Sequence, residues 1–158
     1  MSEFSHFTPD GKSRMVDVGD KPSTVRMARA SGSVTMQLST LQLIQSGSAA
    51  KGDVLGVARL AGIMAAKKTD GLIPLCHSLP LSSCEIDFEF VEPNALRIEA
   101  TVKTIAQTGV EMEALTAVSI AALTVYDMCK AVDRAMEVHS IQLEEKLGGK
   151  SGHFLRGS

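Results

Sequence analysis

The pair Asp127 and Lys130 stands at the end of a long segment that carries no charged side chain after Glu113. On a helix, residues three apart share a face and can touch. Such a pair is ordinary on a protein surface and weak there. Because the preceding turns are apolar, we expect this pair where a helix leaves a buried layer. Desolvation would lower the pKa of the lysine and the carboxylate would raise it, which suits proton transfer.

Glu111 and Glu113 lie at the start of the same predicted helix. About 200° separates them around a regular helix, so we expect that they cannot both face one ligand. Compensation of the helix dipole is the ordinary explanation for acidic residues in a first turn. A carboxylate beside free backbone N–H groups can also accept from two adjacent donors, such as the N1–H and amino group of guanine. We therefore include both residues as candidate ligand-binding residues.

Cys76 and His77 occur in an apolar connection, DGLIPLCHSLPLS, at residues 70–82. The imidazole could bind a metal, assist a nucleophile or pack within the loop, and packing is the usual role. Adjacent side chains in extended backbone point apart, which argues against a Cys-His nucleophile pair. The three cysteines show no C-x-x-C spacing, so we expect no structural zinc and a reducing compartment.

Three lysines outside these clusters could bind an anion. Lys51 precedes an apolar helix, and Lys146 and Lys150 flank the glycines of GGKSG. The pattern of a phosphate-binding P-loop would need glycine at position 144, which is Glu144, and no long helix follows. Flexible glycines would still let a basic segment close over an anion. The residues alone thus indicate a site for an anionic small molecule without naming it.

The length of 158 residues suits one domain with one core. A net charge of −2 offers no global attraction to nucleic acid or to an anionic membrane. The first residues lack the apolar core of a secretory signal, and no uninterrupted apolar stretch is long enough to span a bilayer, so we expect a cytoplasmic protein. We divide the chain into a flexible arm (1–14), one catalytic domain (15–152) and a tail (153–158).

The hydrophobic pattern predicts an α+β fold. Strict alternation predicts strands, with a hairpin that has one dry face, whereas longer apolar runs predict helices. We expect Asp53 and Ser39 to cap helices, and a bend at Gly32. The predicted order is a strand (24–38), a short helix after Ser39, a helix (51–69) with Lys67 and Lys68 in its last turn, strands (84–91 and 96–104), a helix (111–136) and a strand (137–147). Two helical layers on one face of a four-stranded antiparallel sheet give a ferredoxin-like plait.

Several motifs occur together in one order, over nearly the whole chain. They are MVDV (15–18), KGDV (51–54), LIPLCH (72–77), TGVEMEALTA (108–117), YDMCKA (126–131) and GGKSG (148–152). In these segments the chain strongly resembles the MoaC family of molybdenum-cofactor biosynthesis. The resemblance implies conversion of 3′,8-cyclo-7,8-dihydroguanosine 5′-triphosphate to cyclic pyranopterin monophosphate with release of diphosphate. It also implies a homohexamer, built as a trimer of dimers of ferredoxin-like subunits, with active sites at subunit boundaries.

The resemblance also implies roles for single residues. Asp127 and Lys130 match the catalytic aspartate and lysine of the family, and Lys51 matches a second essential lysine. The remaining matches are substrate-binding or pocket residues: Leu75, Cys76, His77, Met112, Glu113, Arg26, Lys67 and Lys146. The family carries no organic cofactor. A magnesium ion on the substrate phosphates is chemically reasonable, although the acidic residues show no metal-binding spacing.

From the residue chemistry and the family resemblance together, we expect Lys130 to act as general acid or base, with its pKa adjusted by Asp127 and with Lys51 as its partner. Glu113 would hold the guanine-derived edge. The triphosphate would meet Arg26, Lys146 and Lys150.

Two positions depart from the usual family pattern: Gly71 replaces an aspartate, and Ser78 replaces a proline that would constrain His77. We expect a looser loop here. The alternatives are a non-catalytic module that binds a nucleotide or assembles as a ring, and an interaction protein whose apolar helices serve oligomerisation.

Overall fold

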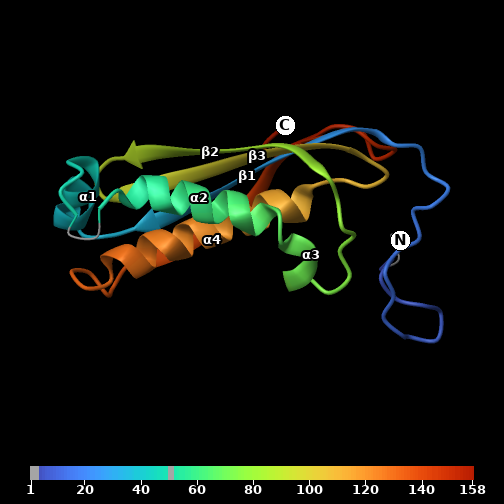
Figure 1. Cartoon of the computed structure of the whole chain (residues 1–158), viewed down its shortest axis with the longest axis horizontal. Coiled ribbons are helices and arrows are strands. Elements are labelled where there is room, and N and C mark those ends of the chain that lie inside the picture. Colours follow the sequence, from blue (N-terminus) through green and yellow to red (C-terminus); the bar gives the residue numbers. More distant parts are fainter. Residues whose placement is uncertain (1–3, 50–51) are drawn as a thin grey trace.

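A single antiparallel sheet with helices on one face makes up the protein in the computed structural model, which describes residues 4–49 and 52–158 (Figure 1). The strands lie in the order β2-β3-β1-β4-β5, and every neighbouring pair is antiparallel. The elements are β1 (Thr24–Thr35), α1 (Leu38–Gln45), α2 (Val54–Ala66), α3 (Thr69–Leu72), β2 (Leu81–Val91), β3 (Ala95–Ala106), α4 (Glu111–Cys129), β4 (Glu137–Leu147) and β5 (Phe154–Leu155).

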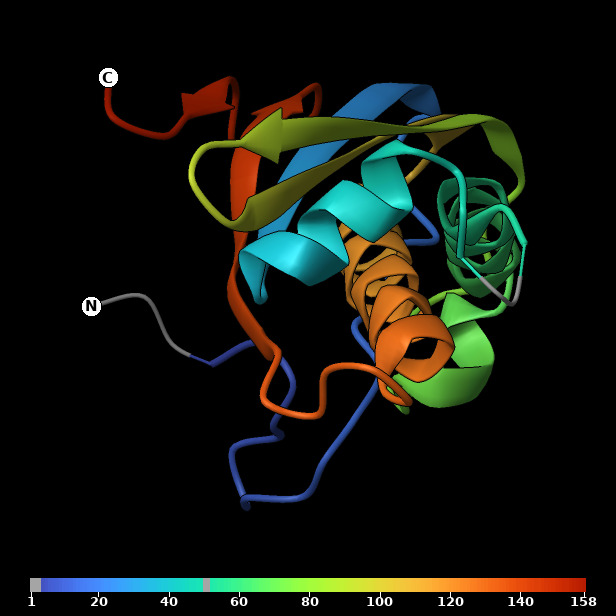
Figure 2. The ribbon, with the colours of Figure 1, turned by 90° about the vertical axis from the view of Figure 1, so that its left-hand side faces the viewer.

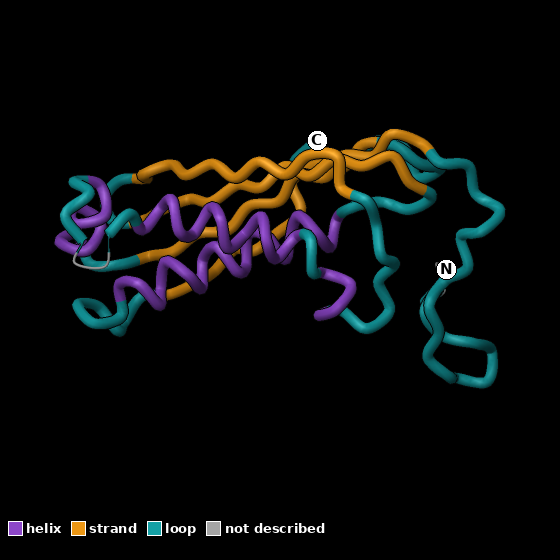
Figure 3. The backbone as a smooth tube through the Cα atoms, in the orientation of Figure 1, coloured by secondary structure: helices purple, strands orange, loops and turns teal. Residues whose placement is uncertain are grey.

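The α+β architecture and the hairpin are confirmed. Viewed along the sheet, all helices lie on one side of it (Figures 2 and 3). Alternate residues of β3 that face these helices are completely buried: Leu96, Ile98, Ala100 and Val102. The opposite face is polar, and there Arg29 forms ion pairs with Glu99 at 3.2 Å and Glu145 at 3.1 Å. The hairpin therefore has one dry face, as its alternation predicts.

Helices α2 and α4 pack closely because small residues line their contact. A side-chain carbon added at Gly62 would lie 2.9 Å from the backbone oxygen of Ala117 and closer still to Ile86 of β2. On α4, the residues facing α2 and the sheet are mostly small and fully buried, including Ala114, Ala117, Val118, Ala121 and Ala122. Asp53 caps α2 as predicted, because its side chain accepts a hydrogen bond from the Gly56 amide at 2.9 Å.

Large apolar side chains are exposed on the outer face of the helical layer. Five large apolar side chains there are about half exposed: Val57, Leu60, Met64, Leu72 and Leu123. Helix α4 is long and apolar enough to cross a membrane. Of its most apolar window, 44% is buried in the protein. The apolar character of α2 and α4 therefore serves the core on one side and an uncovered surface on the other.

Other element boundaries also differ from the predictions. Helix α4 ends at Cys129, seven residues before Met136, and the chain enters a turn in which the Cys129 carbonyl accepts from Val132 and Asp133. Gln37 is the N-cap of α1, so Ser39 lies inside the helix and does not cap it. Helix α2 ends at Ala66, which places Lys67 at its C-cap and Lys68 beyond it.

The predicted sheet had four strands, but the short β5 adds a fifth beside β4. Strand β1 ends at Thr35 and runs through Gly32 without interruption. Its pairing with β4 shifts register between Ser31 and Ser33.

Candidate active site

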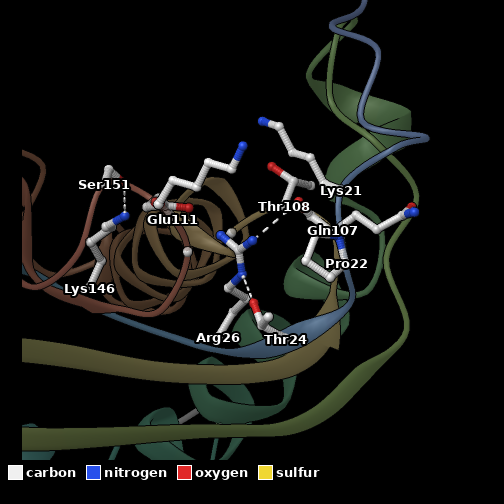
Figure 4. Close-up of a pocket in the computed structure, with 12 residues that line it drawn as sticks. Lys21, Pro22, Thr24, Arg26, Gln107, Thr108, Glu111, Lys146 and Ser151 are labelled. Carbon is white, nitrogen blue, oxygen red and sulfur yellow. Dashed lines mark hydrogen bonds between the residues drawn. The ribbon is translucent and has the colours of Figure 1, made fainter.

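A cationic cavity of about 520 Å³ lies at the end of the sheet where α4 begins (Figure 4). It draws residues from the loop before β1, from β1 itself, from the turn before α4 and from the end of β4. The lining residues with ionisable or hydroxyl groups are Lys21, Thr24, Arg26, Thr108, Glu111, Lys146, Lys150 and Ser151. Four cations and one carboxylate therefore surround the hollow, which makes it a site for an anion.

Arg26 is held rigidly at the centre of this cavity. Its Nε donates to the Thr24 hydroxyl at 2.8 Å, and its Nη2 donates to the Gln107 carbonyl at 3.2 Å. The guanidinium also lies directly against the backbone of Gly149, which has a φ of +80°. A side chain at Gly149 would collide with Nη1 and would be strained in this backbone conformation. The remaining donors of Arg26 are thus presented to the cavity in a fixed direction.

The GGKSG segment forms a tight turn over the same cavity. Lys146 donates to the Ser151 hydroxyl and to the Gly148 carbonyl at 3.3 Å, and the Gly152 amide donates to Gly149 at 3.2 Å. Figure 4 shows Lys146 and Lys21 on opposite sides of Arg26. The structure therefore brings together three of the predicted anion-binding residues, Arg26, Lys146 and Lys150.

A second cavity of about 290 Å³ continues from the first, sharing the wall formed by Lys21, Thr108, Gly109 and Glu111. The predicted substrate-binding segments meet here, because its other lining residues include Leu75, Cys76, His77, Met112 and Glu113. His77 lies 2.7 Å through its Nε2 from the carbonyl oxygen of Val16, so the ring donates to the backbone of the MVDV segment. Part of the imidazole's hydrogen-bonding capacity is therefore structural.

Glu113 is the most buried carboxylate of this site, with only 4% of its surface exposed. Burial raises the pKa of Glu113, and the neighbouring carboxylates Glu111 and Asp70 raise it further. A hydrogen bond from its own backbone N–H acts in the opposite direction and lowers the pKa. Glu111 and Glu113 both line the second cavity, contrary to the expectation that they cannot face one ligand. Both carboxylates therefore border one hollow, although about 200° separates them around a regular helix.

Cys76 contributes its thiol to the cavity wall in a protonated form. Burial raises the pKa of this thiol, and the carboxylates of Glu113 and Asp70 raise it further. Since the thiolate is the reactive form, this environment is unsuited to a nucleophile. The prediction against thiol catalysis therefore has a second, electrostatic reason.

Asp127 and Lys130 form an ion pair at the opposite end of α4, with 2.7 Å between the Lys130 Nζ and Asp127 Oδ1. The Asp127 and Lys130 side chains are 64% and 52% exposed. The pair is therefore solvated in the single chain, whereas the sequence predicted that it would be desolvated. The apolar turns before it face the core, whereas the pair itself points outward. The hydrogen bond and charge of Asp127 raise the pKa of Lys130.

Three of the described site residues line neither cavity: Asp127, Lys130 and Lys67. Lys67 lies at the end of α2, where it lines a separate apolar hollow with Met64 and Leu72. Lys51 lies outside the described residues. The described residues contain no group of three or more His, Cys, Asp or Glu side chains that could hold a metal ion.

The connection at residues 70–82 contributes to the wall of the second cavity and is only partly buried, although its composition is apolar. Leu75, Cys76 and His77 are half-buried, whereas Ser78 is exposed. A side-chain carbon added at Gly71 would meet no atom within 4 Å. Gly71 therefore relieves no clash that the family's usual aspartate would cause within this chain.

Sequence reasoning missed several residues that line the two cavities. Lys21 lies in the GDKPS loop and borders both, and Gln107 holds the loop in place by donating from its side chain to the Gly19 carbonyl at 3.1 Å. His6 and Val16 also line the second cavity. A lysine in a Gly/Pro turn directly before the strand that carries Arg26 is a signal that could have identified Lys21.

Comparison with known proteins gives one family and a set of close relatives. The model of the MoaC family matches residues 15–149. Cyclic pyranopterin monophosphate synthase of Desulfitobacterium hafniense is 57% identical over 98% of this chain and 94% of its own length. The synthase of Thermomicrobium roseum is 59% identical over 99% and 95%, and synthase 1 of Mycobacterium bovis is 57% identical over 98% and 91%.

Proposed function

The chain belongs to the MoaC family, and we propose that it is a cyclic pyranopterin monophosphate synthase of molybdenum-cofactor biosynthesis. Its reaction would convert 3′,8-cyclo-7,8-dihydroguanosine 5′-triphosphate to cyclic pyranopterin monophosphate and diphosphate, as a phosphorus-oxygen lyase. The observation that carries this proposal is the cationic cavity around Arg26, which continues into a second cavity with a buried carboxylate, Glu113. This pair of cavities suits a ligand with a polyphosphate at one end and a guanine-derived ring at the other.

The cationic cavity would bind the triphosphate. Closing the cyclic phosphate requires a sugar-derived oxygen to bond to the α-phosphorus while the bond from that phosphorus to the diphosphate breaks. Negative charge then grows on the departing diphosphate, and fixed cations stabilise it. Arg26 is already oriented by Thr24 and Gln107, so little reorganisation is needed when this charge develops. Lys21, Lys146 and Lys150 would complete the cationic wall.

Glu113 would recognise the guanine-derived ring. An ionised carboxylate can accept from two adjacent N–H donors. Its burial costs free energy in the empty site, and a ligand that supplies those donors would offset this cost. An edge that presents acceptors in place of these two N–H donors would leave the carboxylate without donors, so the residue would select for the guanine-derived edge of the substrate.

Asp127 and Lys130 would move protons during rearrangement of the carbon skeleton, with Lys51 as their partner. In the described structure, the hydrogen bond to Asp127 holds the Lys130 ammonium in place. Enclosure by a second subunit would desolvate the ammonium and lower its pKa toward the working range. The exposed pair of the single chain would thereby become an acid-base group.

The length of α4 supports an active site that combines two subunits. Glu113 and Asp127 lie at opposite ends of this helix, and at 1.5 Å per residue about 21 Å of helix separates them. A general acid or base must lie within about 3 Å of the proton it transfers. A substrate held by Glu113 and Arg26 is therefore beyond the reach of Asp127 in the same chain, and a neighbouring copy would supply the pair.

The uncovered apolar face of the helical layer supports self-association. Leu60, Leu72 and Leu123 expose more than half of their surfaces there. Exposed apolar patches of this kind commonly mark protein interfaces. We therefore retain the homohexamer, a trimer of dimers, as the proposed assembly, and the ferredoxin-like plait as the fold of its subunit.

The remaining features of the proposal concern cofactors and cell location. No organic cofactor is proposed. Since the described residues form no metal-binding cluster, a Mg²⁺ ion would arrive bound to the substrate phosphates, and Glu111 is the carboxylate that lines the cationic cavity. We propose a cytoplasmic enzyme.

Turnover of the cyclised GTP intermediate tests this function directly. The protein is incubated with that intermediate, released diphosphate is measured, and the product is oxidised to a fluorescent pterin. Asp127→Asn and Lys130→Ala should fold and assemble normally yet lose about 10²–10⁴-fold in turnover, the usual contribution of general acid-base catalysis. Folded wild-type protein that releases no diphosphate would instead indicate a module that only binds its ligand.

A further inference from the structure

A buried carboxylate, Asp133, fixes the turn that follows the Asp127 and Lys130 pair. Only 2% of this residue is exposed. Its Oδ2 accepts from the Gln37 amide at 2.8 Å and from the Thr40 hydroxyl at 3.1 Å. Its Oδ1 accepts from the Ala135 amide at 3.2 Å. Asp133 thus joins the turn after α4 to the first turn of α1, which lies far away in sequence.

The carboxylate supplies a cap that α1 lacks by itself. Gln37 is the N-cap of this helix and makes no capping bond with its own side chain. The first amides of a helix need acceptors, and the helix dipole favours a negative charge at that end. Asp133 satisfies both requirements from outside the helix. Its position is therefore specified by α1 as well as by its own turn.

A second bond closes the other side of the same turn. The Tyr126 hydroxyl donates to the Arg134 carbonyl at 3.0 Å, and the Cys129 carbonyl accepts from the amides of Val132 and Asp133. Lys130 therefore lies between two fixed points, the end of α4 and the anchored turn. The exposed side chains of the pair stand on a backbone that is tied down on both sides.

We propose that Asp133 is a positioning residue for the Asp127 and Lys130 pair, acting through the turn at residues 130–136. The inference rests on the proposed function, since it gives Asp133 a role in that reaction. The same bonds hold the N-terminus of α1 against the turn that follows Lys130.

The test compares Asp133→Asn with a matched control, Asp87→Asn, which changes an exposed carboxylate on β2. Asparagine has one acceptor oxygen where aspartate has two, and its amide group would face either the Ala135 amide or the donors of Gln37 and Thr40. Because two donors cannot bond to each other, the turn should loosen. We expect kcat to fall about ten- to hundredfold, the scale of a 1 Å misplacement of a catalytic group. KM should stay within about twofold, because Arg26 and Glu113 lie at the other end of α4.

Two milder variants keep the test informative where Asp133→Asn folds poorly. Thr40→Val removes one donor to the carboxylate, and Tyr126→Phe removes the second bond of the turn. Each should lower kcat several-fold at a temperature where circular dichroism shows the protein fully folded. Hydrogen exchange of the amides at residues 131–136 should become faster in Asp133→Asn and Tyr126→Phe and remain unchanged in Asp87→Asn.

The outcomes separate this inference from the proposed function. Unchanged kcat in Asp133→Asn with an active wild-type enzyme would overturn the positioning role and leave the function intact. A purely structural role would lower the melting temperature while kcat per folded protomer stayed constant, which also counts against positioning. Inactive wild-type protein would refute the proposed function, and hydrogen exchange at the turn would still report whether Asp133 anchors it.

Discussion

The two ends of α4 carry the proposed chemistry, and they differ in how complete they are within one chain. At the N-terminal end, Glu113 is buried and Arg26 is oriented by two hydrogen bonds around a formed cavity. At the C-terminal end, the Asp127 and Lys130 side chains are more than half exposed. Binding groups are thus prepared in the subunit itself, whereas the groups proposed for proton transfer still need an environment.

This difference indicates which properties depend on assembly. A cavity lined by fixed cations can recognise an anion in a lone subunit. A solvated ion pair is a poor acid-base catalyst, because water screens the carboxylate and keeps the ammonium protonated. Association of two copies would join a prepared binding site to a pair that becomes functional only on enclosure. Chemistry would then be confined to the assembled protein.

Mixing two inactive variants gives the largest effect and tests the division of the site most directly. Lys130→Ala and Arg26→Ala, each nearly inactive alone, are unfolded together and refolded as a mixture. Random pairing should restore about a quarter of wild-type turnover, because one site in four receives both intact halves. Diphosphate release measures the recovery. A mixture as inactive as its components would show that one subunit supplies both ends of a site.

Removing Arg26 should weaken substrate binding in addition to lowering turnover. Arg26→Ala should weaken substrate binding about 10- to 100-fold, the range for lost hydrogen bonds to a charged group. Wild-type affinity should fall as salt rises, and this dependence should be shallower in the variant. Isothermal titration at several salt concentrations provides both values. Lys103→Ala, on the polar face of the sheet, is the control; an equal loss there would point to nonspecific attraction.

Replacing Glu113 should separate binding from stability. Its pKa is raised above the ordinary 4.5 by burial, so its ionisation costs stability as pH rises through the native pKa. Glu113→Gln removes this cost. The variant should melt a few degrees above wild type at pH 8 and show no such advantage below pH 4.5, while it binds substrate more weakly.

Thermal melts across this pH range and substrate titrations measure both effects of the Glu113 change. Glu85→Gln, an exposed carboxylate on β2, serves as the control. Equal melting of Glu113→Gln and wild type at pH 8 would contradict the cost assigned to burial.

The smallest effect is expected for stability at the C-terminal end. Since solvent surrounds the Asp127 and Lys130 pair, Lys130→Ala should leave the melting temperature of the dissociated subunit unchanged within error. Differential scanning calorimetry at low protein concentration provides this comparison. A clear destabilisation would show that the pair already supports the fold of a single chain, which would remove the contrast between the two ends.

Much of this arrangement was predictable from local sequence patterns. Alternation gave the buried face of β3, and Asp53 capped α2 as expected. These predictions succeeded because each depends on residues close in sequence.

The failures depend on contacts between distant segments. The hydrophobic pattern continues past Cys129 to Met136, yet α4 stops because Asp133 bonds with α1, more than ninety positions earlier. Lys21 escaped notice because its role comes from the fold of its loop against Gln107. The exposure of Lys130 was misjudged because the uncharged segment before Asp127 indicates only that the preceding turns are apolar. It gives no information on which residues cover the Asp127 and Lys130 side chains.

The contact between Gly149 and Arg26 limits how this protein can tolerate mutation. Any side chain at position 149 would displace the guanidinium, and glycine alone lacks a β-carbon. Every single-nucleotide change in a glycine codon that alters the residue introduces a β-carbon or a stop. Replacing Gly149 with an uncharged residue should therefore weaken anion binding by moving the Arg26 guanidinium, although no charge is lost. Surveys of natural variants that examine only charged residues would overlook this position.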